Sequence, residues 1–150
     1  MGIGESNESL TVNLAPNSQW HSIANQKAWS SENSQSETIN ITTLDSFVNE
    51  KEISSPILLK TDTEGYDLCV LNGAERLLDN KLIDVIICEV GFNLEDKQHS
   101  YFLDIFECLK GFGYKLYLIE DQILYPSSID NLLSLGYANA WFVSPSLSKY

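Results

Sequence analysis

The segment Lys60-Thr-Asp-Thr-Glu-Gly-Tyr-Asp67 groups several carboxylates directly after a short apolar run, residues 57–61. That run has the length and composition of a buried parallel strand, and apolar residues at helical spacing follow the segment. In open α/β sheets, ligands bind at the carboxyl ends of the strands, so Asp62 and Glu64 lie where a site is expected. Gly65 permits the tight turn or close backbone approach that a side chain would block.

Glu89 ends a second apolar run, residues 84–90. If the two runs form neighbouring parallel strands, Asp62, Glu64 and Glu89 share one rim of the sheet. Three carboxylates in one place repel one another unless a cation, a hydrogen-bond donor or a proton lies among them. The alternative is that these acids cap the next helix and complement its dipole, as Asp67 would, or that Glu89 forms a salt bridge with Lys60.

Composition excludes several other chemistries. The 150 residues include 21 acidic and 9 basic ones, a net charge of -12, so nucleic acid and anionic membranes are disfavoured as partners. Cys69, Cys88 and Cys108 are single residues within apolar segments, and His21 and His99 lie far apart. A zinc site, a disulfide framework and a histidine-driven triad are therefore not expected. The polar start of the chain has no secretion signal and no apolar run spans a membrane, so we expect a cytoplasmic protein.

The elements that must position these acids alternate between strand and helix. Strands are expected at residues 57–61, 84–90, 114–119 and 140–143, and helices at 44–51, 68–78 with a break at Asn72-Gly73, 101–110 and 128–135. Thr42 and Asp45 form a candidate capping box for the first helix. This order predicts an α/β fold with a mostly parallel sheet. We expect residues 1–40 to be a polar arm with short strands and residues 41–150 to be the α/β domain.

Several motifs in order resemble the FkbM methyltransferase family. They are Thr43-Leu-Asp45, Leu58-Leu-Lys-Thr-Asp-Thr-Glu-Gly65, Val70-Leu-Asn-Gly-Ala74, Val85-Ile-Ile-Cys-Glu89 and Gly113-Tyr114. The resemblance implies the carboxyl-terminal half of a class I methyltransferase (Rossmann-like) sheet, mostly parallel with an antiparallel last strand. It also implies S-adenosylmethionine as cofactor and O-methylation of a small-molecule or sugar hydroxyl.

The chain departs from the family pattern at its start. The family's glycine-rich cofactor loop and the acid after its second strand are not found, and Gly2-Ile-Gly4 is expected to correspond to the turn after the family's third strand. The resemblance thus implies an amino-terminally truncated enzyme whose cofactor-binding residues are unknown. The strand at 57–61 would then have an unpaired edge, which would be covered by residues 1–40, by a second copy in a homodimer or by a missing amino-terminal half.

Within this family reading, Asp62 and Glu89 are the candidate catalytic residues that orient or deprotonate the acceptor hydroxyl. Lys60, Glu64 and Gly65 are assigned to the substrate or to the turn. No resident metal is expected, although a divalent cation among the carboxylates is an alternative. A non-catalytic remnant that binds a partner through its open sheet edge is the competing function.

Overall fold

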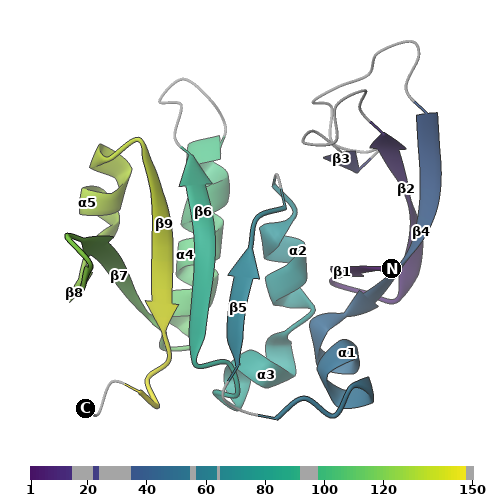
Figure 1. The fold of residues 1–150 in the computed structure, drawn as a ribbon, viewed down its shortest axis with the longest axis horizontal. Helices are drawn as coiled ribbons and strands as arrows, with labels where there is room; N and C mark the ends of the chain where they lie inside the picture. Colours follow the sequence, from purple (N-terminus) through teal and green to yellow (C-terminus); the bar gives the residue numbers. More distant parts are fainter. Residues whose placement is uncertain (15–21, 24–34, 55–56, 64, 92–97, 148–150) are drawn as a thin grey trace.

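The computed structural model describes residues 1–14, 22–23, 35–54, 57–63, 65–91 and 98–147, and these form two sheets with a helical layer (Figure 1). The first sheet has the order β1-β4-β2-β3, with β1 (Gly2–Gly4), β2 (Glu8–Leu14), β3 (Ser22–Ile23) and β4 (Gln35–Thr43). Strand β2 pairs with β4 in antiparallel register, and β1 pairs with β4 in parallel register.

The second sheet carries the candidate site and has the order β5-β6-β9-β7-β8. Its strands are β5 (Leu58–Thr61), β6 (Val85–Gly91), β7 (Lys115–Glu120), β8 (Ile123–Pro126) and β9 (Tyr137–Val143). The pair β5–β6 is parallel, whereas β6–β9, β7–β9 and β7–β8 are antiparallel. The expectation of a mostly parallel sheet is therefore wrong, because the last strand inserts between β6 and β7. The expected antiparallel last strand is confirmed.

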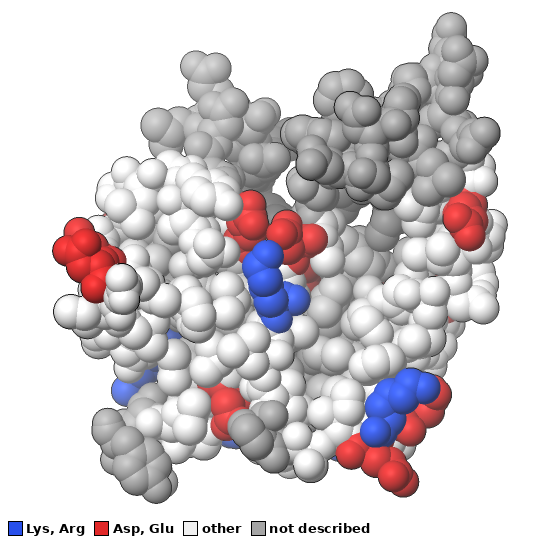
Figure 2. All heavy atoms as spheres, viewed as in Figure 1, with Lys and Arg blue, Asp and Glu red and all other residues white. Residues whose placement is uncertain are grey.

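Helices cover one face of this second sheet: α2 (Asp67–Asn72), α3 (Glu75–Asp79), α4 (Gln98–Gly111) and α5 (Ile129–Ser134). Their apolar residues and those of alternate strand positions form one buried cluster, which includes Leu71, Leu77, Ile86, Leu109 and Phe142. The opposite face is turned to the viewer in Figure 1, and Figure 2 shows that it is largely uncharged outside a central group of basic and acidic side chains. We call it the open face of the sheet.

Helix α1 (Leu44–Glu50) begins one residue later than the expected capping box implies. Thr43, and not Thr42, is the N-cap, and its side chain accepts a hydrogen bond from the amide of Ser46. Asp45 serves another helix instead. Its carboxylate accepts hydrogen bonds from the amides of Arg76 and Leu77 in α3, at 2.9 and 3.0 Å.

The same junction joins the first sheet to the helical layer. The amide of Asp45 donates to the carbonyl oxygen of Gly73 at 3.0 Å, and a side chain at Gly73 would overlap the carbonyl oxygen of Gly4 at the end of β1. Gly2 and Gly4 therefore belong to a strand, which corrects their assignment to a turn. The boundary expected between residues 40 and 41 lies inside β4.

Among the described residues, no helix combines the length and the apolar character needed to cross a membrane.

Candidate functional site

The two strands that carry the candidate acids are parallel neighbours. Leu58 is opposite Val85 and Thr61 is opposite Cys88, so β5 and β6 end at the same edge of the sheet. Asp62 directly follows β5, and Glu89 lies near the end of β6. The shared rim that the sequence predicts for these two acids is present.

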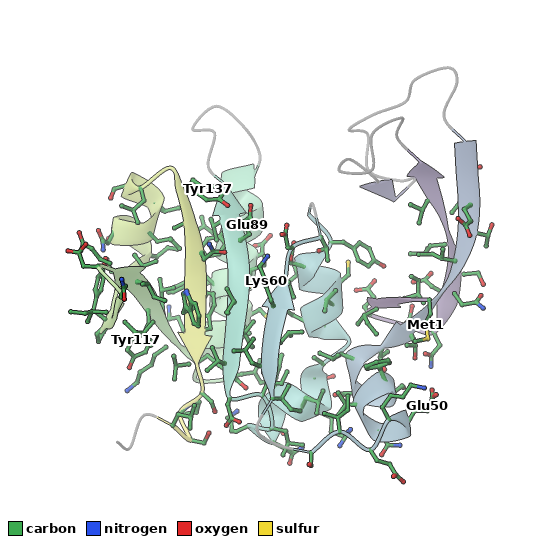
Figure 3. All side chains as sticks on the ribbon, in the orientation of Figure 1. Met1, Glu50, Lys60, Glu89, Tyr117 and Tyr137 are labelled. Atoms are coloured by element: carbon green, nitrogen blue, oxygen red, sulfur yellow. The ribbon has the colours of Figure 1, made fainter. Side chains whose placement is uncertain are left out.

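The ammonium group of Lys60 lies between the two acids (Figure 3). Its Nζ is 3.0 Å from Oδ2 of Asp62 and 4.0 Å from Oε2 of Glu89. The hydrogen bond to Asp62, together with the charges of Asp62 and Glu89, raises the pKa of Lys60. Lys60 thus supplies the cation that neighbouring carboxylates require. The alternative in which Glu89 forms an ion pair with Lys60 is also present in this geometry.

Tyr137 is a site residue that the sequence reasoning missed. Its hydroxyl donates a hydrogen bond to Oε1 of Glu89 at 2.8 Å, and this bond raises the pKa of the tyrosine, since the phenolate could not donate. The expected last strand began at residue 140, whereas β9 begins at Tyr137, opposite Gly91 of β6. An aromatic residue directly after Gly136 is a signal in the sequence that a strand starts at Tyr137. Its pairing with Glu89, however, depends on the register between β6 and β9, which are distant in sequence.

The turn after β5 contains the remaining candidates. Gly65 has a φ of +95°, a value that side chains disfavour, so the need for glycine at this turn is confirmed. Glu64 lies outside the described residues. Asp67 is 7% exposed in the first turn of α2, and its Oδ1 has no hydrogen-bond partner among the described residues. It does not act as the N-cap, because that position is occupied by Tyr66.

A cavity of about 510 Å³ opens on the open face beside Lys60. We call it the hollow. It has a mostly apolar lining with polar side chains at one end: Lys60, Ile87, Leu118, Ile119, Leu135, Tyr137, Ala138, Asn139 and Trp141. Lys60 and Tyr137 belong both to this lining and to the cluster around Glu89, so the hollow adjoins the carboxylate rim (Figure 3).

In the described part of the chain, Gly4 and Gly73 do not form a cradle for the cofactor that the family resemblance implies. Side chains of Ile41 and Tyr66 occupy the space beside Gly4, and the backbone of Gly4 occupies the space beside Gly73. Neither glycine leaves room for a nucleoside. Within the same part of the chain, no three histidine, cysteine or acidic residues gather as metal ligands.

Comparison with protein families gives a match to the methyltransferase FkbM domain over residues 1–116. No curated protein and no solved structure matches the chain. The match covers more than half of the 150 residues, and it includes both strands that carry Asp62 and Glu89. The chain therefore belongs to the FkbM methyltransferase family.

Proposed function

We propose that this chain carries the acceptor side of an S-adenosylmethionine-dependent O-methyltransferase that acts on a hydroxyl group of a small molecule or sugar. The observation that supports this best is the cluster of Asp62, Lys60, Glu89 and Tyr137 at the carboxyl ends of two parallel strands. Strands β5, β6 and β7 run in one direction with β9 antiparallel between β6 and β7, which is consistent with a Rossmann-like sheet of the class I methyltransferase type.

The chemistry assigned to these residues is removal of the acceptor proton. A hydroxyl oxygen that receives a methyl group must give up its proton, and a carboxylate held within hydrogen-bond reach can accept it. Glu89 takes this role in our proposal. The hydroxyl of Tyr137 and the ammonium of Lys60 fix the direction of the Glu89 carboxylate, and Asp62 holds Lys60 in place.

The test is a methyl-transfer assay with labelled S-adenosylmethionine and matched hydroxyl, amine and thiol acceptors. We expect transfer to hydroxyl acceptors, and we expect Glu89→Gln to reduce its rate by about 100-fold, since general bases contribute about 10²–10⁴-fold. Glu107→Gln is the control, because Glu107 is exposed on α4 and its carboxylate pairs with Lys110 of the same helix, away from the site. Preferred transfer to nitrogen or sulfur, or full activity of Glu89→Gln, would contradict the proposal.

We further propose that the methyl donor is held with the help of strands beyond those described, from a second copy of the chain or from an amino-terminal half. Two observations support this. Gly4 and Gly73 leave no space for a nucleoside, and among the described strands β5 is an end strand of its sheet, with Leu58 62% exposed. Calorimetry that finds micromolar S-adenosylmethionine binding by a monomer would contradict it.

The outer edge of β5, which pairs with none of the described strands, also favours a second candidate, a non-catalytic module that pairs this edge with a partner strand. No heat at millimolar S-adenosylmethionine over a range of protein concentrations would favour this candidate. Lysine on an edge strand discourages pairing with another strand. In this second candidate, Leu58→Lys should therefore reduce association of the protein chains in sedimentation experiments. Ile53→Lys, on the loop before β5, is the control and should not change their association.

A further inference from the structure

We propose that the hollow on the open face binds the ring of a neutral, hydroxyl-bearing acceptor, with that hydroxyl directed at Glu89. This inference rests on the proposed function, and it adds the class of substrate and the residues that select it. The cavity of about 510 Å³ lies within the range of about 300–1,000 Å³ that is usual for small-molecule sites.

The floor of the hollow is a row of side chains on three strands, Lys60 of β5, Ile87 of β6 and Trp141 of β9, and Tyr117 of β7 continues this row outside the lining. Lys60 is opposite Ile87, Ile87 is opposite Trp141, and Trp141 is opposite Tyr117. Because side chains alternate between the two faces of each strand, these four residues share the open face. The indole of Trp141 is only partly buried, so a flat apolar surface at the centre of the floor is available to one side of a ring.

Polar groups lie at the end of the hollow that adjoins the carboxylate rim. Asn139 is directly opposite Glu89 in the β6–β9 ladder, and Tyr137 contacts Glu89 through its hydroxyl. A ring packed on Trp141 therefore has a carboxylate, a phenol and an amide at one edge. An apolar floor with a few polar groups at one end is the usual composition of a site that orients a small ligand.

The charges beside the hollow exclude an anionic ligand. Among the described residues that line the hollow, Lys60 is the one basic side chain, and Asp62 already holds its ammonium at 3.0 Å. Asp62 and Glu89 outnumber it, so the cluster carries a net negative charge. A phosphate or carboxylate on the ligand would meet repulsion, whereas a neutral hydroxyl can donate to Glu89.

Strand β9, which supplies four of the nine lining residues, lies beyond the family match. The matched range ends at residue 116, whereas Tyr137, Asn139 and Trp141 belong to β9. The residues that contact the ring in our proposal are thus outside the part of the chain that defines the family, which is where a determinant of acceptor choice is expected.

Nuclear magnetic resonance titration without cofactor tests the proposal. The neutral probes are methyl β-glucoside and 4-ethylphenol, which distinguish a sugar from a phenol, and their anionic counterparts are glucose 6-phosphate and 4-hydroxybenzoate. We expect one neutral probe to shift the indole signal of Trp141 and the amide signal of Asn139, and its anionic counterpart to bind at least about tenfold more weakly.

Two variants locate the binding. Ile119→Asp places a charge on an exposed residue of the lining, and Asn139→Ala removes a polar group with little change to the core. Each should weaken binding of the neutral probe by about tenfold or more, while Ile53→Asp and Asn49→Ala, on exposed residues outside the lining, should not.

The proposal is overturned if neither neutral probe shifts Trp141, if the anionic probes bind equally well, or if neither lining variant weakens binding. If the indole signal of Trp141 shifts with protein concentration and not with any probe, the hollow is a contact between protein chains. That result would also overturn the proposal. Because binding is measured without cofactor, loss of methyl transfer in Glu89→Gln tests the proposed function separately.

Discussion

At the scale of single residues, the cluster around Glu89 combines two acids, a lysine and a tyrosine. The ammonium of Lys60 contacts both acids, and the hydroxyl of Tyr137 reaches Glu89 from a different strand. Each carboxylate thereby has a donor, which explains how the two acids tolerate one another. The contact between Glu89 and Tyr137 can be tested by itself, through the pKa of the tyrosine.

We predict that Glu89→Gln lowers the pKa of Tyr137 toward the usual tyrosine value. The hydrogen bond to Glu89 and its negative charge both favour the protonated phenol, and the substitution removes the charge. Titration of the Tyr137 Cζ signal by nuclear magnetic resonance measures the change. Tyr114, whose pKa is raised to about 12 mainly by burial, is the internal control and should not respond. An unchanged Tyr137 titration would show that the contact is absent in solution.

At the scale of the elements, the motifs Thr43-Leu-Asp45 and Val70-Leu-Asn-Gly-Ala74 form one junction. Asp45 in α1 binds the first amides of α3, and Gly73 between α2 and α3 lies against Gly4 at the end of β1. Helix α3 has only five residues and no side-chain N-cap of its own, so it depends on this distant carboxylate.

Asp45→Ala should lower the free energy of unfolding by about 1–2 kcal/mol, because two helix amides lose their acceptor. Urea denaturation measures the change. Asp79→Ala, at the exposed carboxyl end of the same helix, removes an acid without breaking such a bond and should leave stability within about 0.5 kcal/mol. Equal effects of the two substitutions would contradict the capping role.

Gly73→Ala should destabilise the fold by more than about 2 kcal/mol, since the added methyl group overlaps backbone that cannot move without separating β1 from α2. Gly111→Ala is the matched control. Its Cβ would meet open space at the end of α4, and alanine should be neutral or slightly stabilising there. Thermal denaturation of both variants tests the prediction, which fails if Gly73→Ala melts like the parent chain.

The sequence predicted most of the second sheet because most of its strands and the helices that cover it have strong local periodicity. Residues 57–61 and 84–90 were placed correctly, as were the break at Gly73 and the two candidate acids. Strand β8 was missed, since its residues are mostly exposed and lack alternation between apolar and polar positions. Tyr137 and Asn139 were missed for another reason: their place beside Glu89 follows from the register of β6 and β9, which are separated by over 45 residues in sequence.

At the scale of the whole molecule, a buried thiol and a buried phenol beneath the helices make the free energy of unfolding depend on pH. Desolvation raises the pKa of the Cys88 thiol to about 12, and Cys88 is fully enclosed between β6 and the helices. Tyr114, between α4 and β7, is also held neutral by burial. Both groups are neutral in the folded state at a pH where the unfolded chain begins to lose their protons.

We predict that the free energy of unfolding falls as pH rises from about 9 toward 12. Over this range the unfolded thiol is ionised and the folded one is not, so each pH unit costs up to about 1.4 kcal/mol for Cys88. Urea denaturation at pH 7, 9, 10 and 11 measures the slope. Cys88→Ala should flatten it, and Cys69→Ala, at a less buried site, should flatten it less. A slope unaffected by Cys88→Ala would contradict the assignment.

The position of β9 between β6 and β7 has a consequence for synthesis on the ribosome. Strands β6 and β7 have no direct ladder and are joined only through β9, which is translated after both. A nascent chain that has not yet reached Tyr137 therefore exposes two separate strand edges, and Glu89 still lacks its phenolic partner. Folding of this half of the molecule must wait for late residues, so premature termination there would leave an aggregation-prone product rather than a shorter folded domain.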